Sequence, residues 1–191
     1  MSKRSKKTGA EKPSVLFLCT YNSVRSQIAE GLMRSLCPDR FEVFSAGIAP
    51  AGLHPLAIKT MREIGIDISS QQAKSVRDFR TTHFDYVISF SNELPDILGR
   101  RMPSGETILV CPVQSPSDLY LDEIEALADF RELRENLKRI LEHTFGKYPL
   151  VPGEICMMVG EDHQGTSLCS EEKSAGSYRF LNRTSYIQSS V

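Results

Sequence analysis

A cysteine and an arginine six residues apart, Cys19 and Arg25, are the residues of this sequence whose types and spacing best suit chemistry. An arginine guanidinium presents a planar pair of N–H donors that fits a tetrahedral oxyanion. A cysteine is nucleophilic as its thiolate, and the positive environment that binds an anion also favours that form. The pair therefore predicts an enzyme site at which a thiolate meets an oxyanion.

A predicted strand, loop and helix position these two residues. Residues 15–19 are an apolar run of strand length, and residues 23–36 repeat apolar side chains at helical spacing. Asn22 lies in the turn between them, where it tolerates a left-handed backbone. The backbone N–H groups of such a loop and the positive end of the helix dipole point to one place. We therefore expect an anion site there.

The remaining chain alternates predicted strands and helices. Strands are expected at residues 41–46, 86–90 and 107–111, and helices at residues 55–64, 93–98 and 122–145. This order predicts an α/β fold, a three-layer sandwich whose central sheet has four parallel strands with helices on both faces. Ligands of such sheets bind beyond the carboxyl ends of the strands, so the position of Cys19 agrees with the predicted fold.

The composition indicates one globular domain, residues 14–145, with two appended segments. Residues 1–13 carry five Lys or Arg and are expected to be a flexible basic arm, with a nucleic-acid or membrane role as the alternative. Residues 146–191 are rich in Ser and Gly and are expected to be a flexible tail, with a docked extension containing a short strand as the alternative.

Charge and cysteine usage limit the class of protein. The net charge of −1 gives no argument for binding nucleic acid or anionic lipid, and no apolar run approaches the about 20 residues of a membrane span. The five cysteines are irregularly spaced, with no C-x-x-C or Cys/His ligand pattern. This usage argues against a disulfide framework and a metal site, and it favours a reducing cytoplasm. We expect no bound metal or cofactor.

The loop and its flanks resemble the low-molecular-weight protein-tyrosine-phosphatase superfamily, and within it the thioredoxin-type arsenate reductases. The resemblance is carried by residues 15–32 (VLFLCTYNSVRSQIAEGL), residues 45–69 and residues 84–90. It covers roughly residues 14–145 and implies a phosphatase-like fold for them.

The resemblance implies a role for each residue of the loop. Cys19 would be the nucleophile and Arg25 the oxyanion clamp. Ser26 would hydrogen-bond the thiolate, and Asn22 would hold the shape of the loop. The oxyanion would be held by the backbone N–H groups of Thr20, Tyr21, Asn22, Ser23, Val24 and Arg25. Tyr21 stands where the family often has a small residue, so its ring could narrow or line the mouth of the site.

The sequence departs from the family at the general acid. Members carry Asp-Pro after the fourth strand, whereas this chain has Ser115-Pro116 at that position. A serine is too weak an acid to protonate a leaving alkoxide, and losing general-acid help reduces the rate by about 10²–10⁴. Asp118 is the candidate substitute, with a solvated or helix-capping carboxylate as the alternative reading.

A second departure concerns the thiols that complete a reductase cycle. Thioredoxin-coupled members use two cysteines after the third strand, and this chain has Ser91 and Leu98 there. An external thiol would then resolve Cys19, or another cysteine of this chain would. The candidates within the chain are Cys111, Cys156 and Cys169.

Three functions follow from these residues. The favoured one is arsenate reduction, in which Cys19 attacks arsenic and a thiol from mycothiol, glutathione with glutaredoxin, or thioredoxin releases arsenite. Because the leaving group is then water, the missing acid should matter less than in a phosphatase. The alternatives are hydrolysis of aryl phosphomonoesters through a phosphocysteine, and a non-catalytic module that binds oxyanions. None of the three involves nucleic acid or a membrane.

Overall fold

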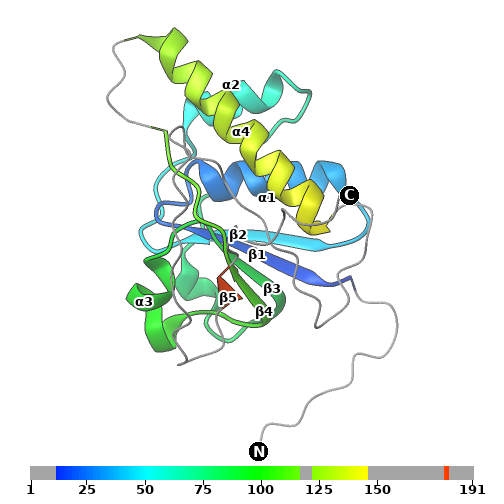
Figure 1. The fold of residues 1–191 in the computed structure, drawn as a ribbon, viewed down its shortest axis with the longest axis vertical. Coiled ribbons are helices and arrows are strands. Elements are labelled where there is room, and N and C mark those ends of the chain that lie inside the picture. Colours follow the sequence, from blue (N-terminus) through cyan, green and yellow to red (C-terminus); the bar gives the residue numbers. More distant parts are fainter. Residues whose placement is uncertain (1–11, 117–121, 146–178, 181–191) are drawn as a thin grey trace, which may run out of the picture.

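The computed structural model describes residues 12–116, 122–145 and 179–180. Strands and helices alternate along this part of the chain. Figure 1 shows three layers, with the sheet between a group of three longer helices and one short helix. The group consists of α1 (Arg25–Leu36), α2 (Pro55–Arg62) and α4 (Glu123–Phe145), and the short helix is α3 (Leu94–Leu98).

The central sheet is parallel throughout and has the strand order β2-β1-β3-β4-β5. Its strands are β1 (Ser14–Cys19), β2 (Glu42–Gly47), β3 (His83–Ser89), β4 (Ser104–Val110) and β5 (Arg179–Phe180). The four longer strands confirm the predicted four-stranded parallel sheet. The fifth is a two-residue strand beside the end of β4, and the rest of the predicted tail lies outside the described residues, as does most of the predicted basic arm.

Two apolar clusters cover the two faces of the sheet. Successive residues of β1 alternate between them, so Val15 and Phe17 pack under α1 and α4. Leu16 and Leu18 face the other cluster, which includes Leu94 of α3. Because both faces are covered, β1 is a nearly continuous apolar run rather than an alternating one.

Arg134 fixes the crossing of α4 over α2. Its guanidinium is buried and donates to the backbone carbonyl of Thr60 at 2.8 Å. Next to it, Arg131 forms a two-bond ion pair with Glu63, at 2.8 and 2.6 Å. The Arg131 guanidinium holds the pKa of the Glu63 carboxyl below its usual range. These polar contacts tie α4 to the C-terminal end of α2.

Some element details differ from the sequence prediction. The helical spacing of apolar residues in 122–145 predicts Ile124 on the apolar face of the last helix, but it is 78% exposed. It lies in the first turn of α4, which Figure 1 shows extending beyond the sheet. β3 begins at His83, three residues before the predicted start, because it continues its pairing with β4 to Ser104. In the part of the chain that the structure describes, no helix is both long and apolar enough to cross a membrane.

Candidate active site

The loop between β1 and α1, residues 20–24, is held by the segment that follows β2. Three backbone N–H groups of that segment bond to carbonyls of the loop: Ala49 to Thr20 (3.0 Å), Ala51 to Tyr21 (2.9 Å) and His54 to Ser23 (3.0 Å). These carbonyls therefore turn outward. Among the described residues, none accepts a hydrogen bond from the backbone N–H of Tyr21, Ser23, Val24 or Arg25. A set of unpaired N–H groups of this kind is an anion-binding concavity.

Asn22 and Gly47 give the loop its tight shape. Asn22 has a φ of 48°, in the left-handed region, and it is the one residue other than glycine with a positive φ in the described part of the chain. Gly47, at the end of β2, lies directly against the loop. A Cβ on Gly47 would come within 2.7 Å of the Asn22 nitrogen and 2.8 Å of the Thr20 oxygen. The close approach of these two main-chain segments requires glycine.

Replacing Gly47 with alanine should therefore distort the loop. Because the added methyl group meets main chain rather than flexible side chains, we expect the free energy of unfolding to fall by about 1–3 kcal/mol. Phosphate binding, measured by calorimetry, should weaken in parallel. Gly52→Ala is the matched control, since a Cβ there meets nothing within 4 Å. Wild-type phosphate affinity in Gly47→Ala would contradict this account of the loop.

The thiol of Cys19 is buried at the centre of the loop, with 3% of the residue exposed. Its Sγ lies 2.9 Å from the Oγ of Ser26, and it accepts a hydrogen bond from the backbone N–H of Asn22 at 3.2 Å. Ser26 is itself fully buried in the first turn of α1. The structure thus brings together three of the residues that the sequence assigned to the site.

The side chain of Asn22 determines which way the Ser26 hydroxyl points. Its Oδ1 accepts from the backbone N–H of Lys74 (2.7 Å) and from Nε2 of Gln27 (3.1 Å). Nδ2 is therefore the atom that donates to Ser26 Oγ, at 2.8 Å. Because Ser26 accepts that bond, its own hydrogen is free to be donated to the sulfur of Cys19. Hydrogen bonds of this kind are stronger when the acceptor is a charged thiolate.

The buried carboxylate of Glu30 supports this hydrogen-bond arrangement. Asn22 Nδ2 also donates a hydrogen bond to Ser45 Oγ (2.8 Å), and Ser45 Oγ in turn donates one to the carboxylate of Glu30. The Glu30 side chain is 2% exposed and pairs with Lys74 Nζ at 3.2 Å and with Arg34 at 2.7 Å. Two cations thus compensate the buried charge, as burial of a carboxylate requires. The network joins the loop to β2, α1 and the segment before β3.

Sequence reasoning missed this supporting network. One signal was available, because Ser26, Gln27 and Glu30 are polar residues that share one face at the start of a helix expected to pack on the sheet. Lys74 carried no such signal, since it lies in an irregular segment and reaches Glu30 only through the tertiary fold.

Hydrogen bonds from one edge of its guanidinium hold Arg25 in place. Its NH1 donates to the backbone carbonyls of Phe90 and Val113, both at 3.0 Å. Within the described residues only NH1 has such partners, so Nε and NH2 remain to form a two-bond contact with an oxyanion. Both carbonyls follow the ends of strands, at β3 and β4. These bonds fix the Arg25 guanidinium at the carboxyl ends of the sheet.

The start of α1 adds to the positive character of the loop. Val24 is its N-cap residue and offers no side-chain acceptor, and the first turn contains no acidic residue. The first N–H groups of a helix have no partner within the helix and carry the positive end of its dipole. Here no side chain neutralises them, so the helix start favours a bound anion.

Among the described residues, no expected helper residue forms a hydrogen bond with the Cys19 sulfur. Ser115 is exposed, and Asp118, the candidate acid, lies outside the described residues. Leu98 is buried within α3 and Ser91 is half-buried in the turn before it. Cys156 and Cys169 also lie outside the described part of the chain.

Cys111 is the candidate resolving thiol that the structure describes. It follows the end of β4 and is a free, buried thiol. Burial raises its pKa to about 12. At neutral pH it is therefore almost entirely protonated, whereas thiol exchange requires a thiolate.

The sequence of this chain is similar to one protein family and to several known proteins. The family model described as "Low molecular weight phosphotyrosine protein phosphatase" matches residues 14–107. An arsenate reductase of Halalkalibacterium halodurans is 35% identical over 130 residues, which are 68% of this chain and 93% of the relative. A glutaredoxin arsenate reductase of Synechocystis sp. is 31% identical over 144 residues, covering 70% of this chain and 96% of its own.

A solved structure agrees with the fold. An arsenate reductase in its phosphate binding state superimposes with a TM-score of 0.57 and 31% sequence identity. The superposition covers 71% of this chain and 98% of the solved one.

Proposed function

The chain belongs to the low-molecular-weight phosphotyrosine protein phosphatase family, and we propose that within it the protein acts as an arsenate reductase with Cys19 as nucleophile. The observation that carries the proposal is the placement of the Cys19 sulfur, which lies in a loop of unpaired N–H groups and receives hydrogen bonds from Asn22 and Ser26. The curated relatives of Halalkalibacterium halodurans and Synechocystis bear the same activity in their names.

The first step joins sulfur to arsenic. Arsenate binds to the loop N–H groups and the start of α1, and Arg25 contacts two of its oxygens through Nε and NH2. The Cys19 thiolate attacks arsenic, an As–S bond forms, and one oxygen leaves as water with protons from arsenate and solvent. Because water is the leaving group, a serine at position 115 is a smaller handicap here than in the hydrolysis of an alkyl phosphate.

The second step reduces arsenic. A second thiolate attacks the Cys19 sulfur, an S–S bond forms, and the electrons of the As–S bond pass to arsenic, which leaves as arsenite. A further thiol then reduces the disulfide and restores Cys19. Electrons are balanced because two thiols become one disulfide while As(V) becomes As(III).

The second thiol comes from outside the chain in this proposal. Ser91 and Leu98 replace the usual pair, and Cys111 is buried and protonated. Glutathione with glutaredoxin is the first choice, because the Synechocystis relative is a glutaredoxin arsenate reductase. Mycothiol and thioredoxin are the other candidates. Such donors place the reaction in a reducing compartment, the cytoplasm.

Cys111→Ala should leave arsenate turnover at the wild-type rate. The side chain is buried and its pKa is raised to about 12, so it supplies no thiolate to the cycle at pH 7–8. The measurement is arsenate-dependent oxidation of the external thiol by the folded variant. Cys37→Ala is the matched control, since Cys37 is also a free, buried cysteine. A large loss of turnover in Cys111→Ala alone would make Cys111 the resolving thiol and contradict the proposal.

The proposed activity is tested directly with purified protein and four reductant systems: mycothiol, glutathione, glutaredoxin with glutathione, and thioredoxin with its reductase. We expect arsenate-dependent thiol oxidation with at least one of them, and arsenite as the product. Turnover with none of the four would end the proposal.

Hydrolysis of phosphomonoesters is the second candidate function, favoured by the match to the phosphatase family model. The same loop would bind phosphate in place of arsenate, and Cys19 would form a phosphocysteine. A purely anion-binding role needs Arg25 and the loop N–H groups but no thiol. The buried, hydrogen-bonded Cys19 therefore favours a catalytic role over anion binding alone.

A further inference from the structure

His54 is the residue at which the anion loop meets two helices. Its backbone N–H donates to the carbonyl of Ser23 in the loop at 3.0 Å. Its side chain is the N-cap of α2, where Nδ1 accepts from the backbone N–H of Leu56 at 3.2 Å. The imidazole ring also stacks on Phe130 of α4, with 4.8 Å between the ring centroids. One residue thus joins the loop to α2 and α4.

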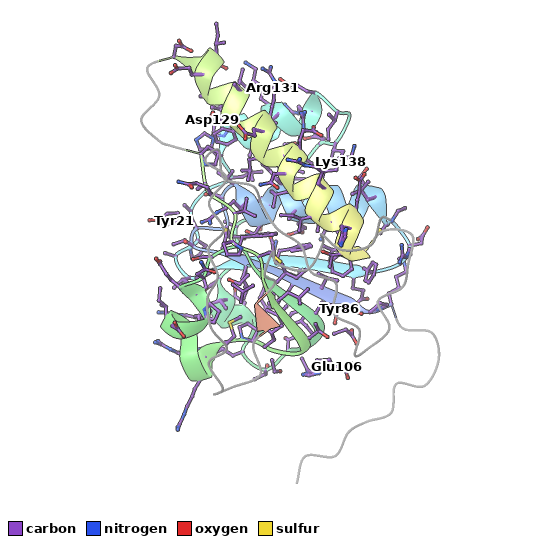
Figure 2. All side chains as sticks on the ribbon, in the orientation of Figure 1. Tyr21, Tyr86, Glu106, Asp129, Arg131 and Lys138 are labelled. Carbon is purple, nitrogen blue, oxygen red and sulfur yellow. The ribbon has the colours of Figure 1, made fainter. Side chains whose placement is uncertain are left out.

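The rest of the segment that holds the loop has little to anchor it. Residues 49–52 read Ala-Pro-Ala-Gly and are all exposed. They bond to the loop at the outer edge of the molecule, where Figure 2 shows Tyr21 beside the start of α1. The side chains that follow them, Leu53 and His54, are half-buried, and Leu53 packs against the apolar core. The position of the segment therefore depends on these two side chains.

The hydrogen bond from His54 determines the direction of one N–H group of the loop. The Ser23 carbonyl and the Val24 N–H belong to the same peptide unit, and no peptide bond in the described residues is cis. In a trans unit these two groups point in opposite directions. Because His54 holds the carbonyl outward, the unpaired Val24 N–H points into the concavity of the loop.

The N–H group that bonds to the sulfur is oriented by a different contact. Asn22 donates its backbone N–H to Cys19 Sγ at 3.2 Å. The same peptide unit contains the Tyr21 carbonyl, which accepts from the N–H of Ala51 at 2.9 Å. Loss of the His54 side chain should therefore affect anion binding more than the environment of the sulfur.

We propose that His54 is a positioning residue of the anion site, whose imidazole fixes its own main chain and so directs the Val24 N–H at the bound oxyanion. The side chain acts through the main chain of Ser23 and Val24. The inference rests on the anion site of the proposed function but not on the reduction of arsenate.

The test removes the helix cap and then restores it. His54→Ala loses the acceptor and the ring, so phosphate should bind about three- to ten-fold more weakly in calorimetry. Asparagine is among the best N-cap residues, so His54→Asn should bind phosphate within about twofold of the wild type. In arsenate kinetics the loss in His54→Ala should appear in KM, with kcat changed by less than about twofold.

Asp122→Ala is the matched control, because Asp122 also caps a helix. Its Oδ1 accepts from the backbone N–H groups of Ile124 and Glu125, at 2.8 and 2.9 Å, at the start of α4. Among the described residues, no hydrogen bond joins Asp122 to the anion loop. Thermal unfolding should show a similar loss of stability in the two alanine variants. Phosphate affinity should fall only in His54→Ala.

Alkylation of Cys19 by iodoacetamide is the readout that separates the anion from the sulfur. Its rate in His54→Ala should stay within about twofold of the wild-type rate, because the N–H bond to the sulfur is oriented by another contact. A fall in alkylation as large as the fall in phosphate affinity would contradict the assigned role.

Unchanged phosphate affinity in His54→Ala would overturn the proposal. Equal weakening in His54→Asn or in Asp122→Ala would overturn it too, since the cap would then have no particular link to the loop. Arsenate turnover is measured on the same samples. If arsenate is not reduced while phosphate binding follows the expected pattern, the reductase proposal fails and the role of His54 stands.

Discussion

Cys19→Ser is expected to fold normally and to lose at least about 10⁴-fold of the arsenate-dependent thiol oxidation. A serine hydroxyl at this position is not ionised at neutral pH, and oxygen cannot form the S–S bond through which electrons reach arsenic. The measurement is the initial rate of thiol oxidation with saturating arsenate, with circular dichroism to check the fold. Aryl phosphate hydrolysis should be lost in the same variant.

Binding should survive this substitution. The proposed anion ligands are Arg25, the unpaired loop N–H groups and the start of α1, and none of them bonds to the sulfur. Phosphate should therefore still bind to Cys19→Ser in calorimetry. Cys37→Ser, at a buried cysteine that follows the end of α1, is the control and should turn over as the wild type does. Appreciable arsenate turnover by Cys19→Ser would remove Cys19 from the role of nucleophile.

Arg25→Lys is expected to lower kcat/KM for arsenate by about 10²–10³, although the charge is unchanged. An ammonium cannot replace a guanidinium that uses one edge for two carbonyls and the other for the anion. The carbonyls of Phe90 and Val113 would each lose a hydrogen-bond donor. The side chain at position 25 would therefore lose both the bonds that position it and the pair of donors that faces the anion. Steady-state kinetics and the phosphate dissociation constant measure the two effects.

Arg62→Lys is the control for Arg25→Lys. Arg62 lies on α2 and forms an exposed ion pair with Asp67 at 3.3 Å. Exposed pairs contribute about 0–1 kcal/mol, so this variant should match the wild type in both assays. If Arg25→Lys retained arsenate kinetics within threefold of the wild type, the assignment of Arg25 as oxyanion clamp would be wrong.

The parts of the fold that the sequence predicted are those set by local patterns. Apolar runs bounded by turn residues mark the four longer strands, and a 3.6-residue period marks α1 and α4. The sequence placed Asn22 in the turn as a residue that tolerates a left-handed backbone, and its φ of 48° agrees. The residues from Cys19 to Ser26 are contiguous in the sequence, so the residues of the loop could be assigned without knowledge of any tertiary contact.

The parts that could not be predicted depend on residues distant in the chain. The carbonyls that anchor Arg25 lie 65 and 88 positions away, and a main-chain carbonyl has no side-chain signature in a sequence. Lys74 reaches Glu30 across 44 positions from an irregular segment. The contact between Gly47 and the loop depends on the register of β2 against β1, which only the assembled sheet defines.

The central claim is that Cys19 carries the chemistry and that the thiol completing the cycle comes from outside the chain. Mass spectrometry of the protein after a single arsenate turnover in the presence of glutathione tests it most directly. We predict that Cys19 is recovered as a mixed disulfide with glutathione, while Cys37 and Cys111 remain free thiols. Recovery of a disulfide between Cys19 and another cysteine of the chain, or of unmodified Cys19 after arsenite has formed, would contradict the account.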